Sequence, residues 1–377
     1  LWLDDDAGRL YAARGLDNAV SVLDADSLEV LGAFPVATYP FDLERAPGGD
    51  LIVAEYKGGG IDLGSVTVVD VDSLDLEQTT EEVSRLYATP TTQFPMDCDG
   101  FFPVPRESGQ ETPLQHVVLV VKENKTFDCL FGDMGDELGV EADPEYLRWP
   151  AELTPNQRAL MREFNVSDNF HVNARESDSG HLYLTSAHMT HFVEWMFVET
   201  ARNGGSFTWP MEAASYPSVG NFFTHLLDHG KTIQIYGEIV GMFETAGDGT
   251  QVMEFSDLDY PGGPFYSYAA TDEQRGAYIG EQIADDGLAD FTFILFPNDH
   301  TAGTTDGLPT PESMVADNDR GLGVFIEALS GSDAWASTVV FVLQDDPQGC
   351  DDHVNDSRSP LFVISPWAKR GGYVSKA

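Results

Sequence analysis

Side chains that bind metal ions follow three short apolar segments of the sequence. Each segment runs directly into carboxylate, amide or imidazole groups: Glu123 and Asn124, Asp299 and His300, and Asp345 and Asp346. A further imidazole, His353, comes seven residues after Asp346. A single acidic residue in such a place is explained as a turn, but three in equivalent places indicate a site. Carboxylates with a few imidazoles bind Zn, Mn or Fe, or Ca and Mg if the imidazoles stay out.

A parallel sheet would bring these residues together. Apolar strands are expected at 116–121, 231–236, 291–296, 338–343 and 360–365, and helices at 154–164, 180–197, 219–229 and 317–329. Short apolar runs that alternate with long helical stretches predict an α/β fold, a parallel sheet covered on both faces. The crevice at the carboxyl ends of such strands is where ligands bind. We therefore predict one α/β domain over residues 114–377 with its site at that edge.

Two local patterns add detail to the helices. Thr154, Pro155 and Gln157 are typical of a helix start in which Thr is the N-cap and Gln closes a capping box. The segment 317–319 is interpreted as an acidic helix start.

Residues 1–80 contain a repeat. Leu10–Gly15 recurs as Leu51–Tyr56, and Val20–Leu28 recurs as Val66–Leu74. Alternating strands with Asp and Gly turns at a period of about forty residues predict β-propeller blades. The segment 81–113 is rich in Pro, Gly and Thr and is interpreted as a linker.

The composition excludes several classes of protein. With 63 acidic and 20 basic residues the formal charge is -43, which leaves no basic surface for nucleic acid. Hydrophobic residues make up 42%, so the chain has material for a core. No apolar run is long enough to span a membrane. Cys98, Cys129 and Cys350 leave at least one thiol unpaired and do not decide the redox compartment. Both ends of the chain look cut.

Several motifs resemble known families. The segment 18–24 and the tract 10–15 resemble YVTN-type propeller blades. The segment 123–128 resembles the "ENRSFD" motif of the bacterial phosphoesterase family, which includes phospholipases C and acid phosphatases and belongs to the alkaline phosphatase superfamily. Similar stretches follow in the family's order: 154–157, 168–170, 177–181, 297–301, 345–354 and 358–361. In such proteins a propeller often precedes the phosphoesterase domain.

The resemblance implies roles for individual residues. Metal ligands would be Glu123, Asn124, Asp299, His300, Asp345, Asp346 and His353. Lys125 and Arg358 would attract the anionic substrate. The nucleophile would be a hydroxyl at a helix N-terminus, either Ser177 or Ser179, with Ser177 ranked slightly ahead. His181 would bind phosphate or hold a residue that contacts the metal or the substrate. The alternative is that it is an ordinary helix histidine.

The sequence therefore predicts a metal-dependent hydrolase of phosphate esters, either monoesters or diesters such as phospholipid head groups. The resemblance further implies an extracellular or periplasmic location, although this chain contains no signal peptide. The same scaffold supports hydrolysis of sulfate esters and phosphonates. A rival hypothesis from another class is a binding protein that retains the metal without turnover.

Overall fold

The protein is described here by a computed structural model. It describes residues 1–60, 63–87, 102–105, 109–174, 177–190, 192–193, 213–218, 220–238, 240–347 and 350–374. The chain divides into two compact units, Leu1–Gly100 and Phe101–Ala377. Among the described residues, none of the helices combines the length and the apolar composition needed to cross a lipid bilayer.

The first unit is built from antiparallel sheets. One sheet has the order β1-β2-β3-β4 and the other β5-β6-β7. The strands are β1 Trp2–Asp4, β2 Arg9–Arg14, β3 Ala19–Asp24, β4 Val30–Pro35, β5 Pro40–Arg45, β6 Leu51–Gly60 and β7 Leu63–Val69. Their inward residues, among them Tyr11, Val20, Phe34 and Val53, form a separate core. The strands predicted from the repeat are present, but two sheets alone do not make a propeller.

Helix α1, Leu76–Tyr87, follows the second sheet and packs on the edge strand β4. Thr80 Oγ1 accepts a hydrogen bond of 2.9 Å from the backbone N–H of Ala33, and Gly32 makes room for Leu76 and Thr80. The helix extends into the stretch interpreted as a linker, so that prediction is wrong for residues 81–87. The next part of the predicted linker, 88–101, lies outside the described residues.

The second unit contains a seven-stranded sheet of order β10-β11-β8-β12-β13-β9-β14. The strands are β8 His116–Lys122, β9 Asn165–His171, β10 Ile233–Tyr236, β11 Phe291–Phe296, β12 Thr338–Gln344, β13 Arg358–Ile364 and β14 Gly372–Val374. Neighbouring strands are parallel except for β13, which is antiparallel to both β12 and β9. The predicted α/β fold is confirmed, with a mixed, mostly parallel sheet. Strands β9 and β14 were not predicted.

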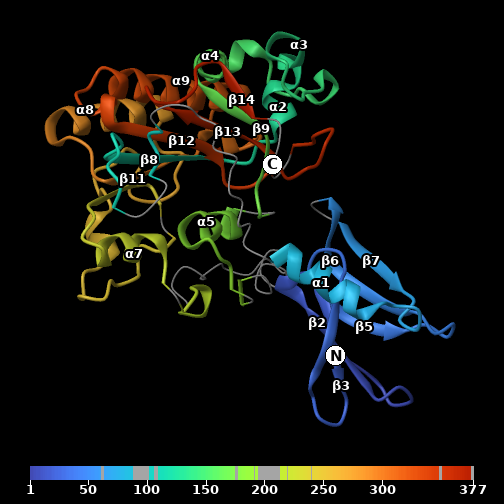
Figure 1. Ribbon diagram of the computed structural model, residues 1–377. Helices are drawn as coiled ribbons and strands as arrows, with labels where there is room; N and C mark the ends of the chain where they lie inside the picture. Colours follow the sequence, from blue (N-terminus) through green and yellow to red (C-terminus); the bar gives the residue numbers. More distant parts are fainter. Residues whose placement is uncertain are drawn as a thin grey trace. The chain divides into compact units, whose positions relative to one another are not determined.

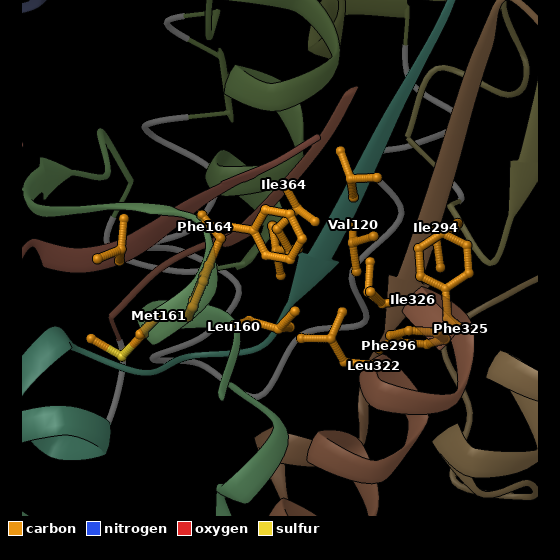
Figure 2. Close-up of a cluster of buried hydrophobic side chains, with 14 of the residues drawn as sticks. Val120, Leu160, Met161, Phe164, Ile294, Phe296, Leu322, Phe325, Ile326 and Ile364 are labelled. Carbon is orange, nitrogen blue, oxygen red and sulfur yellow. The ribbon is translucent and has the colours of Figure 1, made fainter. Parts of the chain in front are cut away.

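Helices cover both faces of this sheet (Figure 1). Helices α4 Pro155–Glu163, α8 Asp272–Asp286 and α9 Pro311–Ser330 lie on one face, and α5 Ser177–Ser186 and α7 Phe222–Asp228 lie on the other. The alternation of side chains along each strand explains the two cores. Val120, Ile294 and Phe296 point to the first face, where they pack with Leu322 and Phe325 of α9 (Figure 2). The residues between them, such as Val121 and Phe293, pack with α7 on the second face.

The start of α4 differs from the predicted capping box. Thr154 is the N-cap residue, but its side chain makes no capping hydrogen bond. Asp319 of α9 takes that part: its carboxylate accepts from the backbone N–H of Asn156 and of Gln157, each at 2.9 Å. The interpretation of 317–319 as a helix start is wrong, because these residues lie inside α9 and are buried.

The remaining helices are shorter or differ in length from expectation. Helix α5 ends at Ser186 rather than near 197, and residues 191 and 194–200 lie outside the described part of the chain. Helix α7 begins after Asn221, whose side chain caps it. After β8 come α2 Phe127–Phe131 and α3 Gly135–Leu138. A disulfide joins Cys129 of α2 to Cys350, beyond the end of β12.

Candidate active site

The site begins where β8 ends. Glu123 follows the strand and is 1% exposed, and Asn124 adopts a left-handed backbone conformation with φ of 63°. Asn tolerates this conformation better than most residues. The turn aims two backbone N–H groups at neighbouring strand ends: Glu123 donates to Oδ1 of Asp299 at 2.9 Å, and Asn124 donates to Oδ1 of Asp345 at 3.3 Å. The ends of β8, β11 and β12 are thus joined, as the sequence predicted.

Helix α5 brings a hydroxyl to these carboxylates. Ser177, the first residue of the helix, is half-buried and donates toward Oδ2 of Asp346 at 2.9 Å and Oε2 of Glu123 at 3.3 Å. The helix comes close because Gly180 has no side chain: a Cβ there would lie 2.4 Å from the carbonyl oxygen of Asp345. Ser179, the other candidate nucleophile, is 1% exposed.

An unpredicted residue, Glu238, completes the site. It follows β10, is 1% exposed, and its Oε2 lies 2.5 Å from Nδ1 of His181. The other imidazole nitrogen, Nε2, lies 3.5 Å from Oε1 of Glu123 and 3.6 Å from Oδ2 of Asp345. Ligands bind at the carboxyl ends of parallel strands, and this applies to β10 as well as to β8, β11 and β12. The sequence therefore contained a signal for Glu238.

The buried charge in this group is strongly negative. Glu123, Asp345 and Asp346 are each at most 2% exposed. Burial, with the carboxylates of Asp346 and Glu123 beside it, raises the pKa of Asp345 well above its usual range. Burial alone would lower the pKa of His181, but Glu238, Glu123 and Asp345 outweigh it and raise that pKa well above its usual range. The group therefore favours the addition of positive charge.

Ligand atoms of Glu123, His181 and Asp345 all lie within 4.8 Å of one another, close enough to share one metal ion. Oδ2 of Asp345 is buried without a hydrogen-bond partner among the described residues. The amide of Asn124 can donate its NH2 to Oε2 of Glu123 (2.8 Å) and to Oδ1 of Asp345 (3.1 Å). In the opposite orientation of the amide, its oxygen faces the same two carboxylates. A cation between these oxygens would stabilise that orientation. These donors fit a divalent cation.

Asp299 lies at the site but its oxygens are taken by protein donors. Oδ1 accepts from the backbone of Glu123 and from Nδ2 of Asn318 at 3.1 Å. Oδ2 accepts from Nζ of Lys122 at 3.1 Å and from Nε2 of Gln344 at 3.4 Å. Asp299 thus ties the strand ends together, and its predicted role as a ligand would require it to give up one of these bonds.

His300 stands beside Asp299 in a different setting. Its Nδ1 lies 2.8 Å from the hydroxyl of Tyr268 and 2.9 Å from the carbonyl oxygen of Thr301. The structure does not include His300 in the group formed by Glu123, His181 and Asp345.

The structure places His353 and Arg358 elsewhere, in a second group with Asp128 and Asp352. Nδ1 of His353 contacts Oδ2 of Asp128. The guanidinium of Arg358 is fully buried and donates to Asp128 at 2.9 Å and to Asp352 at 2.8 Å. Its Nη1 donates to the carbonyl oxygens of Glu141 and Asp168, both at 2.7 Å.

The predicted roles of these two residues stay proposals. Ligand atoms of His353, Asp128 and Asp352 lie within 4.8 Å of one another, so His353 belongs to a second group that could hold a metal ion, apart from Glu123. Arg358 is the buried cation of this second group, and a contact with substrate would compete with its hydrogen bonds to protein oxygens.

Lys125 is also turned inward. It is 4% exposed, and its Nζ donates to the carbonyl oxygens of Glu123 (3.3 Å) and Asn124 (3.1 Å). Burial, together with the nearby positive charge of Lys122, lowers its pKa. Lys125 therefore stabilises the turn that contains Glu123 and Asn124. Its predicted contact with the substrate stays a proposal.

The profile of the phosphoesterase family matches residues 146–377, more than half of the chain. The chain belongs to the phosphoesterase family. This phosphoesterase is accordingly a hydrolase that acts on ester bonds. No curated protein sequence matches it significantly.

Solved structures resemble the phosphoesterase at low sequence identity. A protein of the alkaline phosphatase superfamily from Vibrio parahaemolyticus has 17% identity and a TM-score of 0.46, and the match covers 70% of this chain and 62% of that one. Murine ectonucleotide pyrophosphatase/phosphodiesterase 5 has 15% identity and a TM-score of 0.38, and the match covers 61% of this chain and 57% of that one. A lipoteichoic acid synthase from Listeria monocytogenes has 16% identity and a TM-score of 0.38, and the match covers 69% of this chain and 67% of that one. The chain thus spans less than two thirds of the first two proteins, and similarities this weak carry no inference about activity.

Proposed function

We propose that this phosphoesterase hydrolyses phosphate esters with Ser177 as the nucleophile and a divalent cation held by Glu123, Asn124, Asp345 and Asp346. One observation carries the proposal: the hydroxyl of Ser177 rests on the carboxylates of Asp346 and Glu123, at 2.9 and 3.3 Å. A hydroxyl at the start of a helix, beside buried metal-binding oxygens, is suited to attack a phosphorus atom.

The cation would polarise the phosphoryl oxygens and lower the pKa of a bound water. Zn, Mn, Fe, Ca and Mg are all open as its identity, because the donors are mostly oxygen with one imidazole nearby. Asp299 and His300 are a less favoured extension of the ligand set. The oxygens of Asp299 already accept from protein donors, and His300 lies outside the group formed by Glu123, His181 and Asp345.

The residues of the site would then have the following roles in the reaction. Oγ of Ser177 would form the new bond to phosphorus as its proton passes to the carboxylate of Asp346. The ester bond to the leaving group breaks, and the departing oxygen takes up a proton from water. Asp346 and Glu123 accept the hydrogen bond of the hydroxyl and orient it. The N-terminal end of α5 favours the negative charge of the phosphoryl group. Water then cleaves the phosphoseryl group and restores the hydroxyl. Lys125 would assist the approach of substrate only by its charge.

The family points to phosphate esters as the substrate class, and both monoesters and diesters, including phospholipid head groups, fit it. Sulfate-ester or phosphonate hydrolysis on the same scaffold is the chemical alternative. A metal-retaining binding protein without turnover is the alternative outside catalysis. The disulfide between Cys129 and Cys350 supports an extracellular or periplasmic location, where disulfides persist.

The proposal extends to the domain organisation. Residues 1–80 would be blades of a YVTN-type propeller, linked to a phosphoesterase domain at 114–377. A four-stranded antiparallel sheet, as in β1–β4, is the repeating unit of a propeller and supports this assignment.

The test is hydrolysis of p-nitrophenyl phosphate and bis-p-nitrophenyl phosphate before and after removal of metal by a chelator. Activity should vanish with the metal and return with one or more of Zn, Mn, Fe, Ca or Mg. Rapid acid quenching during turnover should trap phosphate on Ser177, which peptide mass spectrometry locates. No turnover with any of these metals would favour the binding protein, and phosphate trapped on Ser179 would move the nucleophile.

A further inference from the structure

The carboxylate of Glu238 is committed to His181. Its Oε1 accepts from the backbone N–H of Val240 at 2.7 Å, and its Oε2 lies 2.5 Å from Nδ1 of His181. The glutamate is 1% exposed, so the pair is shielded from water. The backbone contact fixes the carboxylate, and the carboxylate in turn holds the imidazole in one orientation.

This contact determines which nitrogen of His181 faces the site. An ionised carboxylate can only accept hydrogen bonds, so the proton lies on Nδ1. A metal ion displaces the second proton, because only the neutral ring is a ligand. The lone pair then lies on Nε2, which is the nitrogen near Oε1 of Glu123 and Oδ2 of Asp345. A carboxylate behind a histidine whose second nitrogen binds metal is a recurrent arrangement in metal sites.

The distances around Nε2 suit a shared cation. Nε2 lies 3.5 Å from the Glu123 oxygen and 3.6 Å from the Asp345 oxygen, longer than ordinary hydrogen bonds. Ligands about 2.1 Å from a metal lie roughly 3–3.5 Å from each other. The Asp345 oxygen concerned is buried and has no hydrogen-bond partner among the described residues, so it too is available as a ligand.

We propose that His181 binds the same cation through Nε2 and that Glu238 is the positioning residue that fixes its ring; this inference rests on the proposed function. The site then has one nitrogen ligand among its oxygens, which favours Mn, Fe or Zn over Ca and Mg. His300 and His353 are not assigned to this cation, because neither belongs to the group formed by Glu123, His181 and Asp345.

The test is metal binding by the full chain, measured without substrate. Mn²⁺ titrated into metal-free protein is followed by electron paramagnetic resonance, and pulsed measurements report nitrogen bonded to the ion. The wild type should bind Mn²⁺ with an imidazole nitrogen signal, and His181→Asn should lose that signal. Glu238→Gln should weaken Mn²⁺ binding by about 10–100-fold, as the loss of such supporting partners does elsewhere. Glu254→Gln, the same change at an exposed glutamate, should alter neither quantity.

The outcomes separate this inference from the proposed function. A wild-type protein that binds Mn²⁺ without a nitrogen signal overturns the inference, whatever the variants do and whether or not they fold. So does a signal lost in His300→Asn but kept in His181→Asn, or unchanged Mn²⁺ affinity in Glu238→Gln. Hydrolysis that persists in any of these cases leaves the proposed function standing. Nitrogen ligation without hydrolysis of any ester supports the inference and rejects the function.

Discussion

The hydroxyl oxygen of Ser177 lies 2.9 Å from Oδ2 of Asp346, and the two residues are brought together by elements far apart in the sequence. Asp346 lies beyond the end of β12, while Ser177 opens α5. The contact depends on the missing side chain of Gly180, which lets α5 approach the strand end.

Ser177→Ala should abolish turnover while leaving the fold intact. The substitution removes the proposed nucleophile, and losses of about a thousandfold or more in kcat are usual for such residues. The matched change Ser179→Ala, two residues along the same helix, should retain most of the activity. Steady-state kinetics with p-nitrophenyl phosphate, with Mn²⁺ affinity as a check on the site, decide the point. The reverse pattern would make Ser179 the nucleophile.

Arg358→Met should destabilise the protein strongly. It leaves Asp128 and Asp352 buried without their cation, which typically costs about 3–5 kcal/mol in the free energy of unfolding. Arg370→Met breaks an exposed pair with Glu163 and should cost at most about 1 kcal/mol. Urea unfolding measures both. A folded Arg358→Met protein of unchanged stability and raised KM would instead restore the substrate-binding role.

His353 should make stability depend on pH. Burial opposes its protonation, but hydrogen bonds with Asp128 and Glu141 prevail and raise the pKa of the imidazole above its value of 6.5 in an unfolded chain. Its contribution is therefore fully present below about pH 6.5 and is lost as the pH rises through the folded-state pKa.

Unfolding of the wild type and of His353→Gln should be compared at pH 6 and pH 9. The advantage of the wild type should shrink at the higher pH. An advantage that grows with pH contradicts the assignment.

Salt should accelerate catalysis. A formal charge of -43 repels an anionic substrate, and ions screen that repulsion. We expect kcat/KM to rise from low toward molar salt, and to rise more steeply for the dianionic p-nitrophenyl phosphate than for the singly charged diester. A rate that falls steadily with salt for both substrates would show that the field of the protein does not limit the reaction.

The sequence was informative about which residues follow the strands of the sheet. It was less informative about which side chains contact one another. Apolar runs before Glu123 and Asp345 marked buried parallel strands, and the geometry of such sheets brings their ends together. The same argument applied to the end of β10 yields Glu238, which lies two residues beyond that strand.

Other contacts could not be predicted because they depend on pairings between distant residues. Arg358 meets Asp128 across more than two hundred residues, and a sequence does not state which buried carboxylate an arginine will neutralise. Asp319 caps α4 from another helix in the same way. The contact between His353 and Asp128 is likewise not readable from the sequence.

The disulfide between Cys129 and Cys350 closes a ring whose ends are 221 residues apart. The ring encloses α5, β10, β11 and β12, and with them Ser177, Glu238 and Asp345. A single cut by a protease anywhere inside it leaves one covalent molecule. Nicked protein should therefore migrate as one species in denaturing electrophoresis until a reductant separates the fragments. Wherever proteases are abundant, this ring would keep the pieces of a cleaved enzyme together.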